Sequence, residues 1–548
     1  MIKIIQYVLC YLLVLKGFGQ NQLPASDWQN DVKFLQETIH RDYAFLFKKV
    51  TQKDFDAAVD TFYKTIPELQ EHQIRVGLSR LVSMFQYGHT QIPYSYVSKA
   101  GIFPINLYQF NDGLYIEGVH KAHEAVLGAK VVSIGETPIA KALELIRPVV
   151  PVENDQYFKA YGLRFLLSPE VLHAQGVIPK LSETVIWTLE KEGQRFSYDF
   201  PTISRDAKPK VFNFTLPTEN WLTAREISET PLYLKHLDSK YYYFEYLENE
   251  KVLYVRQSSV FNHESETLED FYKRLFDFID NNTVDKLIYD VRLNGGGNNF
   301  NNLNLIKGLM ARPHINTKGE FFFIIGRDTF SACQNLTNEI TTYTEAILVG
   351  EPTAENLNFY GDSRPVQLPK SGIKVYLSHV WWQDKPQWEN KDATVPHIAV
   401  EMSYKEYISN ADPVLEAAMA YKDDGFILDP MQHLTQLFMV GDFATLKIDA
   451  TKIAKDPRYR YYDFKEEVSK AGNRVLNQGN REGALFIFEL MAELYPESVG
   501  TWFSLGNLQM ELKQNEKAMT SFQKIIDLEP KSMLARTARN RIATLKKQ

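Results

Sequence analysis

The stretch "KLIYDVRLNGGGN" (residues 286–298), followed by "EFFFIIGRDTFSACQN" (residues 320–335), decides the fold. In each, a short apolar run continues into a glycine-rich or polar loop, and apolar residues at helical spacing come next. A third apolar run, "AILVG", ends at Gly350. Apolar strands that alternate with helices form a layered core with parallel pairing. The sequence therefore predicts a multi-domain α/β protein whose core lies in this part of the chain.

Two regions of different pattern precede this core. From residue 27 to residue 95, apolar residues such as Val32, Leu35 and Ile39 recur at helical spacing, which predicts two to four packed helices. From residue 96 to residue 205 the pattern changes to short alternating β segments and turns. Among them, "GAKVVSIGETPIAKALELI" predicts a strand, a turn and a helix. That order resembles a PDZ domain, whose sheet edge takes an extended peptide as an added strand.

The C-terminal region contains an internal repeat. Four pairs of identical residues are 34 positions apart: Gly472 and Gly506, Ala484 and Ala518, Phe488 and Phe522, and Pro496 and Pro530. This period is typical of tetratricopeptide repeats, in which each repeat is a pair of helices. We therefore expect helical repeats in residues 463–548, which would bind a protein partner or assist assembly. Residues 424–462 are expected to form a connecting segment.

Residues 1–19 have the features of a secretory signal peptide. Lys3 gives a basic start, residues 4–15 form an apolar run, and Gly17 and Gly19 are small residues suited to cleavage. The alternative is an uncleaved anchor, but the run is shorter than the roughly 20 apolar residues that a spanning helix needs. We therefore expect a soluble exported protein, periplasmic or extracellular, with no membrane span after cleavage.

Charge and cysteine content exclude several classes of function. The formal charge is −7, and cleavage after residue 19 removes two lysines and no acids, which makes it −9. Nucleic acids and anionic membranes select a basic surface, so neither is an expected partner. After cleavage one cysteine remains, Cys333, which can form neither an internal disulfide nor a cysteine-based zinc site. No histidine spacing typical of a metalloprotease helix occurs, and no metal or cofactor is expected.

Two loops of the predicted core carry candidate chemistry. Ligands gather at the carboxyl ends of strands in α/β layers, and both "NGGGN" and "RDTFSA" follow a predicted strand. Three glycines alone would suggest only a flexible turn. The second loop, however, places Ser331 at the first turn of a helix, where unpaired N–H groups stabilise a developing oxyanion. Together the loops suggest a nucleophile that faces a backbone oxyanion hole.

These motifs resemble a known family. "DVRLNGGG", "DTFSA", "VGEPTAEN", "ENKDATVPHIAV" and "DPVLEAA" occur in the order found in the tail-specific, or C-terminal processing, proteases. The resemblance covers about residues 27 to 422 and places the catalytic core in residues 206–423, with a fold like that of crotonase and Clp protease. It implies that Ser331 is the nucleophile of a serine endopeptidase. It also implies an oxyanion hole formed by the N–H of Ala332 and the N–H of Gly295 or Gly296.

The same resemblance suggests which residue acts as the base. The branch with a serine–lysine pair takes its lysine from "GExTxGK", but here that position is Asn356, whose amide cannot accept a proton. The tricorn-like branch uses a histidine and a glutamate, for which this chain offers His89 in "YGHT" and Glu389 in "WENKDATVP". An imidazole titrates near neutrality and can take the serine proton, while a carboxylate holds its tautomer.

Two positions depart from the tricorn-like pattern. Gly88 stands where that branch has a serine before its histidine, and His397 replaces the aspartate after the late proline, a change we interpret as structural. Cys333 is expected to pack within the first helical turn rather than to act as a nucleophile.

The leading hypothesis is an exported serine endopeptidase that cleaves peptides or unfolded proteins. Two alternatives stay open: a catalytically degenerate scaffold that binds peptides or partner proteins, and a serine enzyme whose base is another lysine.

Overall fold

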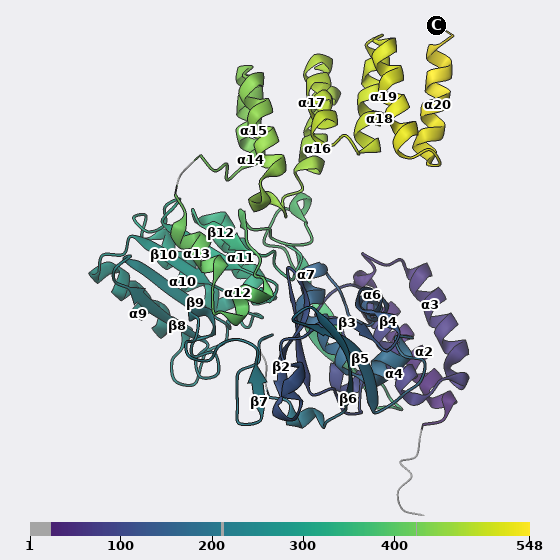
Figure 1. Ribbon diagram of the computed structural model, residues 1–548, viewed down its shortest axis with the longest axis vertical. Helices are drawn as coiled ribbons and strands as arrows, with labels where there is room; N and C mark the ends of the chain where they lie inside the picture. Colours follow the sequence, from purple (N-terminus) through teal and green to yellow (C-terminus); the bar gives the residue numbers. More distant parts are fainter. Residues whose placement is uncertain (1–22, 210–212, 423–424, 548) are drawn as a thin grey trace, which may run out of the picture. The chain divides into compact units, whose positions relative to one another are not determined.

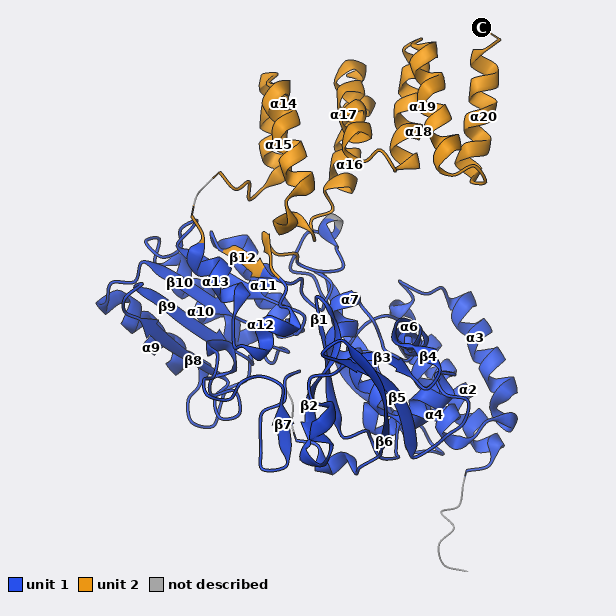
Figure 2. Cartoon of the chain, viewed as in Figure 1, with its two compact units in different colours: residues 1–346, 350–394, 401–420 blue, residues 347–349, 395–400, 421–548 orange. Residues whose placement is uncertain are grey.

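The computed structural model describes residues 23–209, 213–422 and 425–547, which form two compact units (Figure 2). Unit 1 comprises residues 1–346, 350–394 and 401–420, and unit 2 comprises residues 347–349, 395–400 and 421–548. The proposed signal peptide lies outside the described residues. No helix in the described ranges is both long enough and apolar enough to cross a bilayer.

Unit 1 begins with the helices that the sequence predicts. They are α2 (Ala25–Asp42), α3 (Gln52–Thr65), α4 (Glu71–Ser83) and the short α5 (Tyr94–Val97). Thr51 caps α3 by accepting a hydrogen bond from the backbone N–H of Asp54 at 3.1 Å. Leu35 and Ile39 are fully buried, as their helical spacing predicts. The chain leaves α4 through Gln86, whose φ of 54° ends the helical conformation.

A seven-stranded antiparallel sheet follows. Its strands are β1 (Ile105–Phe110), β2 (Gly113–His120), β3 (Lys130–Ile134), β4 (Thr137–Pro138), β5 (Thr184–Lys191), β6 (Gln194–Pro201) and β7 (Trp221–Thr223). The order is β1-β2-β3-β5-β6, with β4 beside β3 and β7 beside β2. The predicted strand, turn and helix are present as β3, β4 and α6 (Ile139–Ile146). Because β7 pairs with β2, this sheet extends past residue 205, where we expected the domain to end.

Short helices lie between the strands of this sheet and at the end of unit 1. They are α7 (Asp155–Tyr157) and α8 (Pro169–Ala174), and then α12 (Tyr404–Ile408) and α13 (Pro413–Ala420).

The predicted α/β core is present in the second half of unit 1 (Figure 1). Its strands are β8 (Tyr242–Leu247), β9 (Val252–Gln257), β10 (Lys286–Asp290) and β11 (Phe321–Ile325), and its helices are α9 (Leu268–Asn281), α10 (Leu303–Met310) and α11 (Ala332–Tyr343). The strand order is β11-β10-β9-β8. β10 pairs in parallel with both β9 and β11, whereas β8 is antiparallel to β9. The loops that follow β10 and β11 therefore leave the same edge of the sheet.

An ion-pair network fixes the carboxyl end of β10. The guanidinium of Arg292 contacts the carboxylates of Asp290 at 2.8 Å and of Asp412 at 2.8 Å. All three side chains are nearly or fully buried, so bulk water does not solvate the guanidinium charge. The two carboxylates compensate it instead. Asp290 and Arg292 thus have a structural role at this strand end.

A hairpin of β13 (Phe359–Gln367) and β14 (Lys374–Trp382) brings a distant segment to the core. Tyr376 of β14 and Gln91 exchange two backbone hydrogen bonds of 2.9 Å. The hydroxyl of Thr90 donates a hydrogen bond to Ser378 Oγ, also in β14, at 2.9 Å. The turn after α4, which contains His89, is thereby held against β14.

Unit 2 contains the strands β12 (Ile347–Gly350) and β15 (Ile398–Ala399), which are neighbours. His397 accepts a hydrogen bond at Nδ1 from the backbone N–H of Leu348 at 2.9 Å. This contact fits the structural interpretation of His397.

The rest of unit 2 is helical. Its helices are α14 (Pro430–Val440), α15 (Phe443–Lys455), α16 (Phe464–Asn477), α17 (Arg481–Leu494), α18 (Val499–Glu511), α19 (Asn515–Leu528) and α20 (Met533–Leu545). The 34-residue period corresponds to repeated contacts: a Cβ on Gly472 would lie 2.7 Å from the Phe488 ring, and one on Gly506 would lie 2.8 Å from the Phe522 ring. A side chain at either glycine would push the paired helices apart.

Residues 424–462 differ from the expected connecting segment, because they contain the helix pair α14 and α15. Asp429 caps α14 through its side chain, and Pro430 occupies the first helical position, where proline needs no N–H partner. Gly441 ends the same helix in the left-handed conformation, with φ of 76°. These are standard helix signals, and they are visible in the sequence.

Candidate active site

Ser331 lies at the junction of the loop after β11 and helix α11. It is the N-cap residue of that helix and has φ of 57° and ψ of −129°, a backbone conformation that costs a non-glycine residue of order 1–3 kcal/mol. Such strain is concentrated at functional sites in proteins. Ala332 begins the helix, so its N–H has no acceptor within α11. The loop thus presents a hydroxyl beside a free helix-end donor.

The structure brings His89 to Ser331 across 242 positions of sequence. His89 Nε2 and Ser331 Oγ are 3.0 Å apart, a hydrogen-bonding distance. The imidazole lies stacked on the ring of Phe330, with centroids 4.6 Å apart and planes 17° from parallel. The ring of Phe359 is also parallel to it, at 6.1 Å. These two rings fix the plane of the imidazole, so that Nε2 points at the serine hydroxyl.

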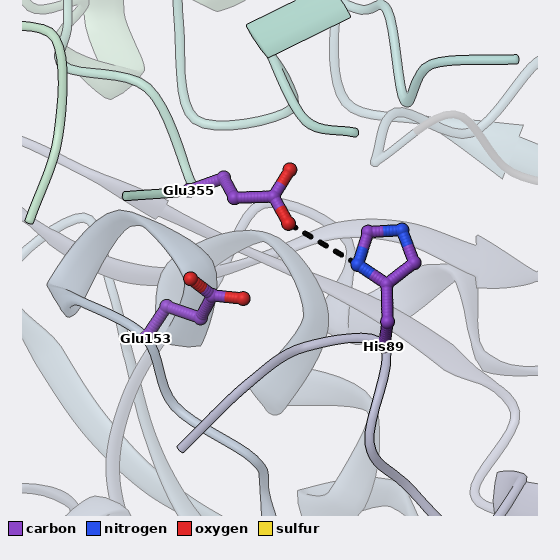
Figure 3. A group of neighbouring side chains, drawn as sticks. All are labelled: His89, Glu153 and Glu355. Carbon is purple, nitrogen blue, oxygen red and sulfur yellow. Dashed lines mark ion pairs between the residues drawn. The ribbon is translucent and has the colours of Figure 1, made fainter. Parts of the chain in front are cut away.

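The carboxylate beside His89 belongs to Glu355 (Figure 3). His89 Nδ1 and Glu355 Oε1 are 3.1 Å apart, and the two side chains are 16% and 0% exposed. The distance is that of an ion pair, although the N–H direction is not aligned for a hydrogen bond. The other oxygen, Oε2, accepts a hydrogen bond from the backbone N–H of Ser331. Glu355 therefore contacts both His89 and the serine.

Glu389 is not brought to this site. It is exposed, ends the short 3₁₀ helix η10 (Gln387–Glu389), and donates its backbone N–H to the carbonyl of Pro386 at 2.8 Å. The carboxylate that the structure places beside His89 is that of Glu355, not that of Glu389. A signal was present in the sequence: Glu355 immediately precedes Asn356, the position of the missing lysine, in a loop of small residues after an apolar strand.

Glu153 is a second carboxylate at the site that the sequence did not indicate (Figure 3). Its Oε1 accepts a hydrogen bond from the backbone N–H of Gly88 at 2.7 Å, and its Oε2 accepts one from Asn356 Nδ2 at 2.6 Å. Burial, together with the charge of the neighbouring Glu355 carboxylate, raises the pKa of Glu153 to about 8. The amide of Asn356 thus holds the carboxylate that anchors the turn before His89.

Gly88 is required by close packing. A Cβ at this position would lie 2.4 Å from the Tyr157 ring and 2.8 Å from the Phe330 ring. A serine therefore does not fit here, and the hydrogen bond that Gly88 donates to Glu153 holds the turn instead.

The glycine loop after β10 packs against the start of α11. Gly296 has φ of 98°, and a Cβ there would lie 2.6 Å from Ser331 Cβ and 2.9 Å from the backbone nitrogen of Ala332. Its own N–H donates to the Asn294 side chain at 2.9 Å. We considered two glycines as oxyanion donors. The N–H of Gly296 already has an acceptor, which leaves the N–H of Gly295, the preceding residue of the same loop, as the candidate donor.

Burial controls the charge of the two groups that face each other. It lowers the pKa of His89 below its usual range, while the charge of Glu153 acts in the opposite direction. Burial also raises the pKa of the Glu355 carboxyl well above its usual range. A neutral imidazole has a free nitrogen lone pair, so His89 is in the form that can accept a proton from Ser331.

Cys333 is fully buried one position inside α11, and burial raises the pKa of its thiol well above the usual range. The thiolate is the reactive form, so we expect Cys333 to resist alkylation by iodoacetamide at pH 8 in the native protein and to react completely in guanidinium chloride. Mass spectrometry of the Cys333 peptide measures this directly. Rapid alkylation of the native protein would show that the thiol is accessible and would contradict the packing role.

No protein-family model matches the chain. The Arabidopsis thaliana "Protein CTR9 homolog" is 30% identical over 95 residues, which are 17% of this chain and 9% of that protein, so the chain spans a small part of that relative.

Several solved structures of proteases show limited likeness. Mature CPAF complexed with lactacystin is 11% identical with a TM-score of 0.46, over 72% of this chain and 98% of that one. The photosystem II D1 C-terminal processing protease is 12% identical with a TM-score of 0.35, over 72% and 96%. A putative peptidase from Parabacteroides merdae is 13% identical with a TM-score of 0.37, over 74% and 100%. At these TM-scores the likeness does not establish a common fold.

Proposed function

We propose that this chain is an exported serine peptidase, similar to the Ser/His/Glu branch of the tail-specific proteases, that hydrolyses peptide bonds through an acyl-enzyme on Ser331. The observation that carries the proposal is the 3.0 Å contact between His89 Nε2 and Ser331 Oγ, with Glu355 at the other ring nitrogen. A serine hydroxyl is a weak nucleophile and needs an adjacent base that a third group orients. These three side chains supply that arrangement.

The reaction proceeds in two halves. Ser331 Oγ attacks the carbonyl carbon of the substrate while His89 Nε2 takes the hydroxyl proton, which gives a tetrahedral oxyanion. The N–H groups of Ala332 and Gly295 stabilise the negative oxygen. His89 then returns the proton to the leaving amine as the C–N bond breaks and the acyl-enzyme forms. Water, deprotonated by the same imidazole, cleaves the acyl-enzyme to a carboxylate and regenerates Ser331.

Glu355 acts on this reaction through His89. Its carboxylate lies beside Nδ1, so it favours the tautomer in which the ring proton is on Nδ1 and the lone pair is on Nε2. When His89 becomes an imidazolium, the nearby carboxylate stabilises the added charge. Glu355 also accepts the backbone N–H of Ser331, which keeps the hydroxyl and the imidazole in register.

A cavity of about 340 Å³ adjoins the proposed oxyanion loop. Its lining includes Gly295 and Leu293 from that loop, together with Tyr161, Lys208 and Asp328. A space of this size beside a reacting carbonyl accommodates a side chain of the substrate. Peptides or unfolded proteins are the substrates that we propose, because an extended chain can place successive side chains along such a surface.

The other regions of the chain have proposed roles in binding. The antiparallel sheet of residues 96–205 would act as a PDZ-like domain that adds a substrate strand to a sheet edge. The helical repeats of residues 463–548 would act as tetratricopeptide repeats that bind a protein partner. Residues 1–19 would direct export to the periplasm or the exterior.

A fluorophosphonate probe tests the proposed nucleophile. The probe forms a covalent bond with a serine that a base has activated, so we expect the wild-type chain to be labelled and Ser331→Ala to be unlabelled. Ser133→Ala is a matched control, because that hydroxyl lies in the same unit and donates to the backbone carbonyl of Gly135 at 3.2 Å. Absence of label from the wild-type chain would contradict the enzyme and favour the binding scaffold.

A further inference from the structure

Three potential metal ligands meet on the side of His89 where Nδ1 lies (Figure 3). One ring nitrogen of His89 and one oxygen each of Glu153 and Glu355 lie within 4.8 Å of one another. The proposed peptidase reaction uses Glu355 to orient the imidazole, but it gives Glu153 no chemical task. No sequence motif announces this cluster, since its members are separated by 64 and 202 positions.

Two atoms of the cluster are buried without a hydrogen-bond partner. They are His89 Nδ1 and Glu355 Oε1, which face each other at 3.1 Å. The Glu355 side chain is 0% exposed, so its Oε1 is out of reach of bulk water. Buried polar atoms are nearly always satisfied in folded proteins, and an exception calls for an explanation such as an ion. A cation between these atoms would satisfy both.

The charge of the cluster also favours a cation. Among the described residues, the ion pair at Glu355 is the one with His89, and no lysine or arginine forms an ion pair with Glu153. Lys49 is the cation whose field reaches both carboxylates, but its ammonium is bound to the carbonyl of Gln86 at 3.0 Å. The two carboxyl groups are buried and close together, and a divalent ion bound by both would balance the charge of their ionised forms.

Zinc is the ion that this ligand set fits. Zn²⁺ binds imidazole nitrogen and carboxylate oxygen, often with three protein ligands and one water. Bonds of about 2.0 Å in a tetrahedron separate neighbouring ligand atoms by about 3.3 Å. The 3.1 Å between His89 Nδ1 and Glu355 Oε1 is close to that value. Magnesium fits poorly, because it prefers six oxygen ligands and keeps several waters.

We propose that His89, Glu153 and Glu355 form a regulatory zinc site that switches the peptidase off. Binding of the ion stands on the cluster alone, whereas the inhibition rests on the proposed function. An imidazole that binds zinc through Nδ1 and stays neutral carries its proton on Nε2. That nitrogen then donates to Ser331 Oγ instead of accepting its proton. Zinc would also withdraw Glu355 from its role in orienting the base.

The site has a route of entry from solvent. Glu153 lines a cavity of about 1160 Å³. Its walls include Phe62 of α3, Arg80 of α4, Met84 at the end of α4, and Asn154. Glu153 thus borders a cavity that Ser331 does not line, which gives an ion an approach to the cluster apart from the serine. This separation distinguishes the proposed inhibition from blockage of the substrate path.

Binding is tested first, without reference to catalysis. The full chain carrying Ser331→Ala, treated with chelator, is titrated with Co²⁺, which substitutes for zinc and gives visible absorption bands when it is four-coordinate. We expect one ion per chain, displaced by Zn²⁺ and not by Mg²⁺. Glu153→Gln and Glu355→Gln should each weaken binding by about 100-fold or more. His433→Asn is the matched control, since His433 pairs with one carboxylate, that of Asp449, at 2.7 Å.

The second measurement tests inhibition in the wild-type chain. Zn²⁺ should slow fluorophosphonate labelling of Ser331, chelator should restore it, and the labelling that remains in Glu153→Gln should no longer respond to Zn²⁺. Circular dichroism of each variant shows whether it is folded. Binding that Glu153→Gln leaves unchanged would overturn the site. Stoichiometric binding without slower labelling would overturn the switch, and a wild-type chain that does not label at all would contradict the proposed function while leaving the Co²⁺ result valid.

Discussion

Replacing His89 by asparagine should lower kcat for peptide hydrolysis by on the order of 10⁶, the scale observed when the base of a serine peptidase is removed. Asparagine is similar in size and can still contact Glu355, but its amide cannot accept the proton of Ser331. The measurement is the rate of cleavage of a fluorogenic unfolded-protein substrate at saturating concentration. Because the loss occurs in the chemical step, KM should change little.

A matched variant separates this effect from a general loss of structure. His40 forms a similar pair with Asp56, at 2.7 Å between Nε2 and Oδ1, in the N-terminal helices of the same unit. His40→Asn should keep kcat within about twofold of the wild type, as expected for a partly exposed position away from the site. Undiminished activity in His89→Asn would show that another group, such as a lysine, is the base.

Replacing Glu355 by glutamine should lower kcat by about 10⁴, because a neutral amide no longer favours the reactive tautomer of the imidazole or stabilises its charged form. The glutamine oxygen can still accept the backbone N–H of Ser331, so the loop should keep its shape. We expect the urea midpoint of unit 1 unfolding to remain near that of the wild type. The rate is measured with the same fluorogenic substrate.

Glu389→Gln provides the contrast. Glu389 is exposed, and the structure places Glu355 rather than Glu389 against His89, so this variant should keep kcat within about twofold. A large loss in Glu389→Gln with little change in Glu355→Gln would reverse the assignment and return the orienting role to Glu389.

The core of the fold was predictable because its signals are local. β10 and β11 are continuous apolar runs, and each is followed by a loop whose composition is visible in the sequence. The position of Ser331 at a helix start follows from the same pattern. The sequence could not reveal its positive φ, because that conformation depends on the glycine loop packed against it and on the acceptor that Glu355 provides.

The carboxylates of the site were not predictable in the same way. Glu355 reaches His89 because the backbone N–H of Ala354 donates to the carbonyl of Thr329 at 3.0 Å, which sets the path of the loop. Glu153 reaches the site from a segment between α6 and α7, where no motif marks it. Contacts of this kind depend on how loops from distant segments meet, which periodicity does not encode.

The order of the site residues along the chain has a consequence for biosynthesis. The proposed base, at residue 89, is made early, whereas the proposed nucleophile and orienting carboxylate are made 242 and 266 positions later. A nascent chain therefore has no complete nucleophile and base pair until residue 355 has been synthesised and folded. The ion pair between Arg292 and Asp412 delays completion of the strand end beside the glycine loop still further. Under the proposed function, a chain that has not yet been translated past Glu355 is therefore unable to cleave itself or the unfolded proteins around it.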